Sequence, residues 1–417
     1  MESRNVTWLG DDFPIFWEEA RGANVRDADG NVYLDLTAAF GVALLGHRDA
    51  GVAEALRVQG GRLVHGMGDV HPPGSKVVFL EGLVDLLENA GFHPREGCRA
   101  LLASSGSEAV EAALKTSHLA TGRPGVVAFR GGYHGLTLGA LSTTARAYFR
   151  MPFRQRLREE QVAWGTFPVS ADSLEESLHE VEVWLADGLP GGVPVGTVIV
   201  EPVQARGGVR IPTPGFGERL TSLARKHGVV LVADEIYTGL GRCGSVLASQ
   251  RVGLDPDLVC LGKVLGGGLP MSACVGSTSV MDAWPASPGE ALHTSTFLGH
   301  PLACAAGSAV LARVAGGLPQ AAEELGGRLR TALVGALGSL GGVREVRGMG
   351  LLLGIELEAG GGVKVAKEAL RQGLLVLPAG DQGEVVELSP PATLTRQQER
   401  AAVEGLVRSI GTVLGSG

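Results

Sequence analysis

Short apolar runs alternate with amphipathic stretches through the middle of the chain. The runs are Arg99–Ala103, Val126–Phe129, Thr197–Val200, Val229–Ala233 and Leu258–Leu261. They are apolar on both faces, as the buried strands of a parallel sheet are. Between them, stretches such as Ser107–Ala120 and Gly215–His227 repeat apolar residues at helical spacing. This order predicts an α/β fold in which helices flank a mostly parallel mixed sheet.

The two ends of the chain have a different pattern, and the first seventy residues are expected to form short strands and turns. Ala23–Leu36 alternates around an Asp-Gly pair, which is a hairpin signal. Towards the other end, Leu318–Leu340 and Thr395–Leu414 are long helix candidates. The strand candidates between them, Gly350–Leu357 and Leu374–Leu377, are separated by what reads as a glycine-rich turn.

The length of 417 residues predicts more than one domain, because a single core usually stops growing at about 250–300 residues. We expect residues 71–305 to form a large domain. Residues 1–70 and 306–417 are expected to build a smaller α+β domain together, so that both ends of the chain belong to it.

Composition narrows the functional classes. A net charge of −8 gives no basic surface for nucleic acid. The five cysteines show no CxxC or Cys/His spacing, which disfavours a metal site and a disulfide framework and favours a reducing compartment. No apolar h-region opens the sequence and no apolar stretch approaches 18 residues, so we expect a cytoplasmic protein without a membrane partner. Only six of the 36 basic residues are lysines, which narrows the search for a catalytic amine.

Unusual residues follow the ends of the predicted strands, where open α/β sheets bind ligands. Ser104–Ser107 forms a Ser/Gly turn before a helix, and its backbone N–H groups could hold a phosphate. The same residues suit an ordinary helix N-cap, which is the commoner reason for this pattern. Further along, Tyr133 stands beside glycines and could stack on a planar cofactor or pack as a loop tyrosine.

Two charged residues end the next strands. Asp234 closes a fully apolar strand, where a carboxylate is costly unless it is paired. It suits a pyridinium nitrogen, a metal or a helix N-cap. Lys263 ends another apolar strand and is placed to have a lowered pKa and to form a Schiff base. A phosphate-binding loop of the GxxxxGK[ST] type is disfavoured, because here the glycines follow the lysine.

Six segments carry a specific resemblance. They are SGSEAVEAALK, GGYHGLTLGALS, VIVEPVQARGG, VLVADEIYTGLGRCG, GKVLGGGLP and STFLGHPLACAAG. Their order and spacing resemble those of the class III (ω-type) aminotransferases, and the segments around Ala23–Leu36 and Ser389 extend the likeness over nearly the whole chain. The resemblance implies the fold type I of pyridoxal-phosphate enzymes, pyridoxal 5'-phosphate as cofactor, and ping-pong transfer of an amino group from an amino acid or ω-amine to an oxo acid.

The resemblance also implies roles for individual residues. Lys263 would be the Schiff-base lysine and general base, and Asp234 would pair with the pyridine nitrogen. The other implied cofactor-binding residues are Ile236 and Tyr133 on the two ring faces, His134 close to the ring, Gly106 and Ser107 at the phosphate, and Glu201 near the substrate. Thr296 would reach the phosphate of the neighbouring subunit. This implies a homodimer with shared active sites, either alone or paired into a tetramer.

The substrate side departs from the family pattern. Phe40, Glu201, Arg206 and Glu387 are the candidate residues there. Many relatives that bind α-amino acids or 2-oxoglutarate have arginine where this chain has Leu136 and Glu387, and many have glutamate where it has Arg206. Leucine and glutamate cannot bind a carboxylate with two hydrogen bonds as arginine does. Arg206 and Glu387 could form a swapped ion pair, which is the interpretation we prefer, or Glu387 could receive a second amino group of the substrate.

Two other functional classes fit parts of the sequence. A racemase, epimerase or aminomutase can use the same lysine and cofactor without an oxo acid partner. A protein that binds the cofactor without turnover is disfavoured, because Lys263 and Asp234 are both present.

Overall fold

A seven-stranded sheet forms the centre of the computed structural model, which describes residues 15–93, 96–338 and 340–415. Its strands are β4 (Cys98–Ala103), β5 (Gly125–Phe129), β6 (Val162–Gly165), β7 (Val195–Val200), β8 (Val230–Asp234), β9 (Leu258–Leu261) and β10 (Ser272–Ser277). They lie in the order β4-β10-β9-β8-β7-β5-β6. β10 runs antiparallel to both neighbours and the other pairs are parallel, so the predicted mixed sheet is confirmed.

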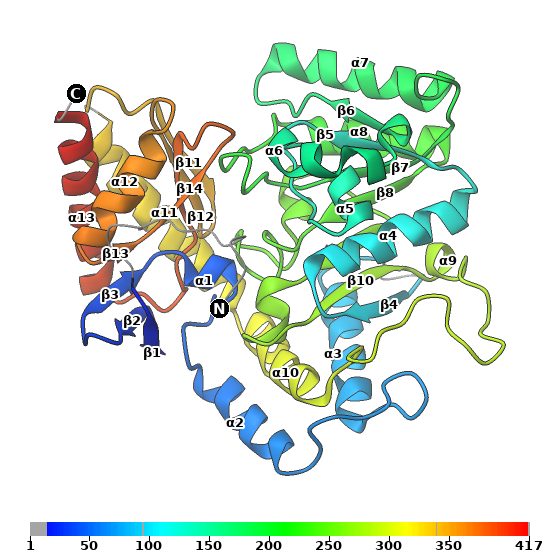
Figure 1. Ribbon diagram of the computed structural model, residues 1–417, viewed down its shortest axis with the longest axis horizontal. Coiled ribbons are helices and arrows are strands. Elements are labelled where there is room, and N and C mark those ends of the chain that lie inside the picture. The colour runs from blue at the N-terminus through cyan, green and yellow to red at the C-terminus, as the bar shows by residue number, and fades with distance from the viewer. Residues whose placement is uncertain (1–14, 94–95, 339, 416–417) are drawn as a thin grey trace.

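Helices cover both faces of this sheet (Figure 1). The side chains of Val198 and Val200 belong to the core cluster under α7 (Ala171–Asp187) and α8 (Phe216–His227). Ile199, between them, belongs to the cluster under α4 (Gly106–Thr121) on the opposite face. Successive side chains of a strand point to opposite faces, so two covered faces require the continuous apolar runs seen in the sequence.

Further helices surround the centre. α3 (Gly74–Asn89) and α2 (Ala50–Gly60) both pack against α10 (Pro301–Ala315). The short helices are α5 (Leu138–Ser142), α6 (Ala147–Arg150) and α9 (Thr278–Met281), and the 3-10 turns are η1 (Met151–Arg156), η2 (Glu159–Gln161), η3 (Ala248–Val252) and η4 (Lys263–Gly266).

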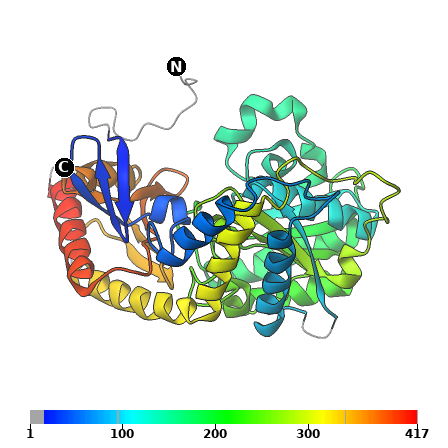
Figure 2. The ribbon, with the colours of Figure 1, turned by 90° about the horizontal axis from the view of Figure 1, so that it is seen from below.

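Two four-stranded sheets lie beside the central one (Figures 1 and 2). The first contains β1 (Trp17–Arg21), β2 (Asn24–Asp27), β3 (Val32–Asp35) and β13 (Leu374–Leu375). The second contains β11 (Glu345–Met349), β12 (Leu352–Glu356), β15 (Val385–Leu388) and β14 (Leu377–Ala379). Three helices pack against these sheets: α11 (Leu318–Leu337), α12 (Gly361–Arg371) and α13 (Arg396–Gly415). Because β13 pairs in parallel with β3, strands from both ends of the chain share one sheet.

Two predictions for the ends of the chain were incomplete. α12 lies where a glycine-rich turn was expected, because Val365, Ala366 and Ala369 form a buried stripe that outweighs the low helix propensity of the glycines before them. α2 lies in a region expected to hold strands and turns, and Asp49 caps it. The domain boundaries at residues 70 and 305 stay a prediction. The expectation that no apolar signal segment opens the chain concerns residues outside those described.

A left-handed turn precedes α2. Ala38, Ala39, Phe40 and Gly41 of α1 (Ala38–Gly41) all have positive φ angles, between 45° and 83°. Each non-glycine residue in this conformation costs roughly 1–2 kcal/mol. Buried Asp35 stabilises the turn, since its carboxylate accepts hydrogen bonds from the backbone N–H groups of Thr37 and Ala39.

In the described part of the chain, no single helix is long and apolar enough to cross a membrane. Only α10 and α11 taken together are long and apolar enough for a membrane span, and they are bent by 65° at their junction.

Candidate active site

A cavity of about 220 Å³ lies at the carboxyl ends of the central strands. The residues that line it are Gly106, Ser107, Tyr133, His134, Gly135, Glu201, Ala205, Arg206, Asp234, Ile236, Tyr237 and Lys263. They come from the start of α4 and from the segments that follow β5, β7, β8 and β9. Most of the residues singled out from the sequence therefore meet in one place, as the edge of a parallel sheet requires.

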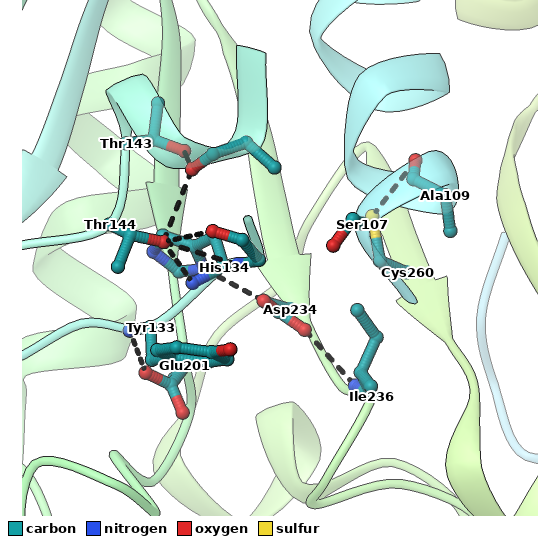
Figure 3. Close-up of polar contacts among 12 residues, drawn as sticks. Ser107, Ala109, Tyr133, His134, Thr143, Thr144, Glu201, Asp234, Ile236 and Cys260 are labelled. Carbon is teal, nitrogen blue, oxygen red and sulfur yellow. Dashed lines mark hydrogen bonds and ion pairs between the residues drawn. The ribbon is translucent and has the colours of Figure 1, made fainter. Parts of the chain in front are cut away.

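Asp234 and His134 form a buried pair (Figure 3). Oδ2 of Asp234 lies 2.7 Å from Nδ1 of His134, and both residues are almost fully buried. The second carboxylate oxygen, Oδ1, accepts a hydrogen bond of 3.1 Å from the backbone N–H of Ile236. Each oxygen thus has one protein partner and retains lone pairs that can accept a further hydrogen bond.

His134 is fixed from its backbone as well. The N–H groups of His134 and Gly135 both donate to the hydroxyl of Thr144, at 2.9 and 3.1 Å. Burial acts against protonation of the imidazole, but the hydrogen bond and charge of Asp234 outweigh it and raise the pKa of His134. The pair therefore favours the imidazolium beside the carboxylate. Thr144 stands in no predicted motif and was not found from the sequence.

Glu201 is the second buried acid of the cavity. Its carboxylate accepts hydrogen bonds from the backbone N–H groups of Tyr133, at 2.8 Å, and Ala205, at 3.2 Å. Figure 3 shows the first of these bonds beside the tyrosine ring. Burial raises the pKa of Glu201 to about 7, against the opposing charge of His134. Glu201 therefore orders the loop that presents Tyr133.

Lys263 enters the cavity directly after β9. Its Nζ lies 4.1 Å from the centre of the Tyr237 ring, a cation–π distance. Burial lowers the pKa of the Lys263 ammonium, while the charges of Asp234 and Glu387 act in the opposite direction. A lysine with a lowered pKa has a larger share of the free amine, which is the nucleophilic form.

The first turn of α4 faces the same cavity. Ser105 and Glu108 form a reciprocal capping box, so the N-cap interpretation is correct. It does not exclude the phosphate interpretation, because Gly106 and Ser107 come after the cap and their N–H groups have no partner within the helix. Ser107 also accepts a hydrogen bond of 3.1 Å from Leu136 N–H. A Cβ at Gly135 would lie only 2.2 Å from Ser107 Oγ, so this approach requires glycine.

Glu387 does not form the expected ion pair with Arg206. Among the described residues, its partner is the Tyr237 hydroxyl, which donates to Glu387 Oε1 and lies 3.0 Å from Ser389 Oγ. Glu387 is buried and is absent from the cavity lining. The preferred interpretation was wrong because Tyr237, which the sequence did not single out, satisfies the carboxylate. Tyr237 follows the candidate residue Asp234 by three positions, and this closeness in sequence was the signal that could have pointed to it.

Arg206 lines the cavity without Glu387. Its guanidinium carbon lies 5.2 Å from the centre of the Tyr133 ring. Two other candidates lie outside the lining: Phe40, in the left-handed turn, is 59% exposed, and Thr296 is exposed on the loop before α10. The role of Thr296 at a neighbouring subunit stays a prediction.

Arg242 is a buried residue that sequence reasoning did not identify. It is fully buried and donates to the backbone oxygens of Leu351, Pro390 and Gly41. Burial lowers its pKa to about 10. Since its partners belong to both ends of the chain, Arg242 joins these segments to the loop that follows β8.

Comparison with known proteins identifies the family. The model of the class III aminotransferases matches residues 8–410. An acetylornithine aminotransferase of Methanopyrus kandleri is 37% identical over 83% of this chain and 81% of its own length. A 5-aminovalerate aminotransferase of Pseudomonas aeruginosa is 32% identical over 94% and 92%. An amine transaminase from an uncultivated Pseudomonas species, solved in its PLP-bound form, superposes with a TM-score of 0.88 at 28% identity, covering 99% of this chain and 98% of its own.

These relatives are aminotransferases and give no support to the racemase alternative. The predicted fold type I is confirmed, and the reaction is transfer of an amino group from a donor to an oxo acid. The chain therefore belongs to the class III aminotransferase family and is a pyridoxal-phosphate-dependent aminotransferase.

Proposed function

We propose that Lys263 is the covalent attachment point of pyridoxal phosphate and that the cavity around it is the active site. The single observation that carries this proposal is that one cavity contains Lys263, the Asp234–His134 pair and the first turn of α4. Ile236 packs closely against the start of α4, since a Cβ at Gly106 would lie 3.0 Å from Ile236 Cδ1. The acid, the lysine and the helix N-terminus in this cavity fit the charges of the cofactor.

The bound cofactor supplies a reactive aldehyde and an electron-withdrawing ring. Asp234, kept in place by His134 and by Ile236 N–H, would hold a proton on the ring nitrogen through its negative charge. Gly106 and Ser107 would bind the phosphate with backbone N–H groups and a hydroxyl at the positive end of α4. Tyr133 and Ile236 would contact the ring.

Lys263 acts a second time in the reaction. With the cofactor bound, the free amine of Lys263 would act as the base that moves the proton at the substrate carbon. The lowered pKa of Lys263 supports this role, because a general base works best when its pKa is near the working pH.

We propose that the donor carries its amino group on a primary carbon. The named substrates of two relatives, acetylornithine and 5-aminovalerate, both have such a group. To test this, terminal amines and α-amino acids are each mixed with holoenzyme. The loss of the cofactor absorbance is followed before any oxo acid is added. Terminal amines should discharge the absorbance faster than α-amino acids of equal length, and the reverse order would contradict the proposal.

We further propose a homodimer whose active sites are completed across the interface. The loops 63–70 and 292–298 contact each other, since His65 and Phe297 have ring centres 5.3 Å apart. They expose six large apolar side chains: Leu63, Val64, Met67, Val70, Leu292 and Phe297. Exposed apolar side chains on two neighbouring loops suit an interface between subunits. Thr296 lies on the same loop, so the partner subunit's Thr296 would reach the phosphate.

Mixed dimers test the shared site. Thr296→Ala should weaken cofactor binding, and Lys263→Ala should abolish turnover. A dimer of one subunit of each kind would have one intact site if Thr296 is donated across the interface, because the defects then fall in the same site. Tagged mixed dimers should therefore bind cofactor with wild-type affinity at one site and recover about half the activity. No recovery would show that each subunit uses its own Thr296.

A cytoplasmic location is also part of the proposal. All five cysteines are free, which suits a reducing compartment.

A further inference from the structure

The guanidinium of Arg206 lines the cavity, and the charge of Arg206 acts on the Glu387 carboxylate without an ion pair between the two residues. Within residues 15–93, 96–338 and 340–415, its side chain has no hydrogen bond or ion pair, although it lies over the Tyr133 ring. The backbone is held, since Arg206 O accepts a hydrogen bond of 3.0 Å from Gly380 N–H. Position and charge are thus fixed while the five N–H donors of the side chain stay available.

The acids closest to Arg206 already have other partners. Asp234 binds His134, and Glu201 accepts from the N–H groups of Tyr133 and Ala205. Glu387 accepts from Tyr237. A cation that is left over after every nearby acid has been paired is suited to an anion that arrives with the substrate.

Two other arginines, Arg242 and Arg146, already have partners within the protein. Arg242 binds three carbonyl groups and does not line the cavity. Arg146 donates to the carbonyl of Gly380. Among the described residues, Arg206 is therefore the one arginine in the cavity lining, and the other basic side chains there are Lys263 and His134.

We propose that Arg206 binds the carboxylate of the amino acid and oxo acid substrates. The inference rests on the proposed function, in which Lys263 marks the reacting end of the substrate. Arginine binds a carboxylate with two parallel hydrogen bonds, which fixes orientation as well as charge. Arg206 and Lys263 line the same cavity of about 220 Å³, so a substrate with its amino group at Lys263 can place its carboxylate at Arg206. Neither of the residues that replace the usual arginines, Leu136 and Glu387, lines this cavity.

Binding of glutarate, an unreactive dicarboxylate, tests the proposal without turnover. Holoenzyme is titrated by calorimetry as wild type, Arg206→Gln and Arg206→Lys. The glutamine variant should bind about 100-fold more weakly, because it loses two charged hydrogen bonds, and the lysine variant should fall between. Arg130→Gln is the matched control, since that guanidinium is exposed and bonds Thr166 outside the cavity.

A pair of donors provides the kinetic test. 5-Aminovalerate and butylamine differ by the carboxylate alone, so Arg206→Gln should lower kcat/KM for 5-aminovalerate by about 100-fold and leave butylamine within about threefold. Bound cofactor is measured from its absorbance in each variant and should equal the wild-type content.

Three outcomes would overturn the assignment. They are wild-type holoenzyme that does not bind glutarate, equal losses with both donors, and loss of cofactor from Arg206→Gln. Failure of the proposed function would look different, because wild-type holoenzyme would then convert no amine at all. The glutarate titration would still decide whether Arg206 binds a carboxylate.

Discussion

The hydroxyl of Tyr237 donates a hydrogen bond to the carboxylate of Glu387, 150 residues further along the chain. The same tyrosine ring lies against the Nζ of Lys263. Glu387 thereby fixes the ring that contacts the proposed catalytic lysine, and it does so from β15, outside the central sheet. Its carboxylate therefore has a hydrogen-bond partner within the protein.

A double-mutant cycle should detect this contact. Tyr237→Phe leaves the buried Glu387 carboxylate without its donor, so we expect a loss of about 1–3 kcal/mol in the free energy of unfolding. Tyr237→Phe and Glu387→Gln together should cost at least about 0.5 kcal/mol less than the sum of the single losses. Denaturant unfolding of the cofactor-free protein provides the measurement.

The control for that cycle combines Glu387→Gln with Arg206→Gln. These residues form no direct ion pair, so their coupling should be smaller than that of Tyr237 with Glu387. A larger coupling with Arg206 would restore the swapped ion pair that we rejected.

Lys263→Ala should abolish turnover and leave the fold intact, because the lysine is replaced at a position where its side chain faces a cavity. Circular dichroism and thermal melting check the fold. In the wild type, borohydride reduction should fix the cofactor to one peptide, and mass spectrometry should locate it on Lys263. An active Lys263→Ala enzyme would remove the residue from the mechanism.

Asp234→Asn keeps the size of the side chain but removes its charge from the pair with His134. Proton transfer at the substrate should slow by at least about 100-fold, which corresponds to about 2.7 kcal/mol. Single-turnover absorbance measures this step, with Asp257→Asn as a control outside the cavity lining. A change below about threefold would make Asp234 a structural acid.

Glu201 should make stability depend on pH. Its pKa is raised by burial from 4.5 to about 7 in the folded protein, so the folded state binds more protons than the unfolded state between these values. The stability that protonation provides is complete below pH 4.5 and is lost as the pH rises towards about 7. Relative to Glu201→Gln, the wild-type cofactor-free protein should therefore melt at progressively lower temperature across this window. A constant difference between the two proteins would contradict the raised pKa.

The sequence predicted those parts of the site that depend on local pattern. Asp234 and Lys263 each end an apolar strand, and parallel strands bring their carboxyl ends to one edge, so the meeting of these residues followed from the pattern alone. The start of α4 was found for the same reason, because a strand and a Ser/Gly turn lead directly into it.

Contacts between distant segments could not be predicted in this way. The bond between Tyr237 and Glu387 depends on how β15 is placed beside the segment after β8, and no local pattern encodes that placement. Arg242 is similar, since a buried arginine that binds three carbonyl groups looks like any loop arginine in the sequence. β10 was missed because its antiparallel insertion between β4 and β9 interrupts the alternating order.

The parallel pairing of β13 with β3 has a consequence for synthesis of the chain. Leu375 pairs with Asp35, about 340 residues earlier, so the edge of β3 stays unpaired until most of the protein has left the ribosome. At roughly 5–20 residues per second, that interval lasts about 20–70 seconds. Unpaired strand edges attract other chains. The N-terminal hairpin therefore exposes an unpaired edge throughout this interval, and we expect slow translation to increase aggregation of this protein.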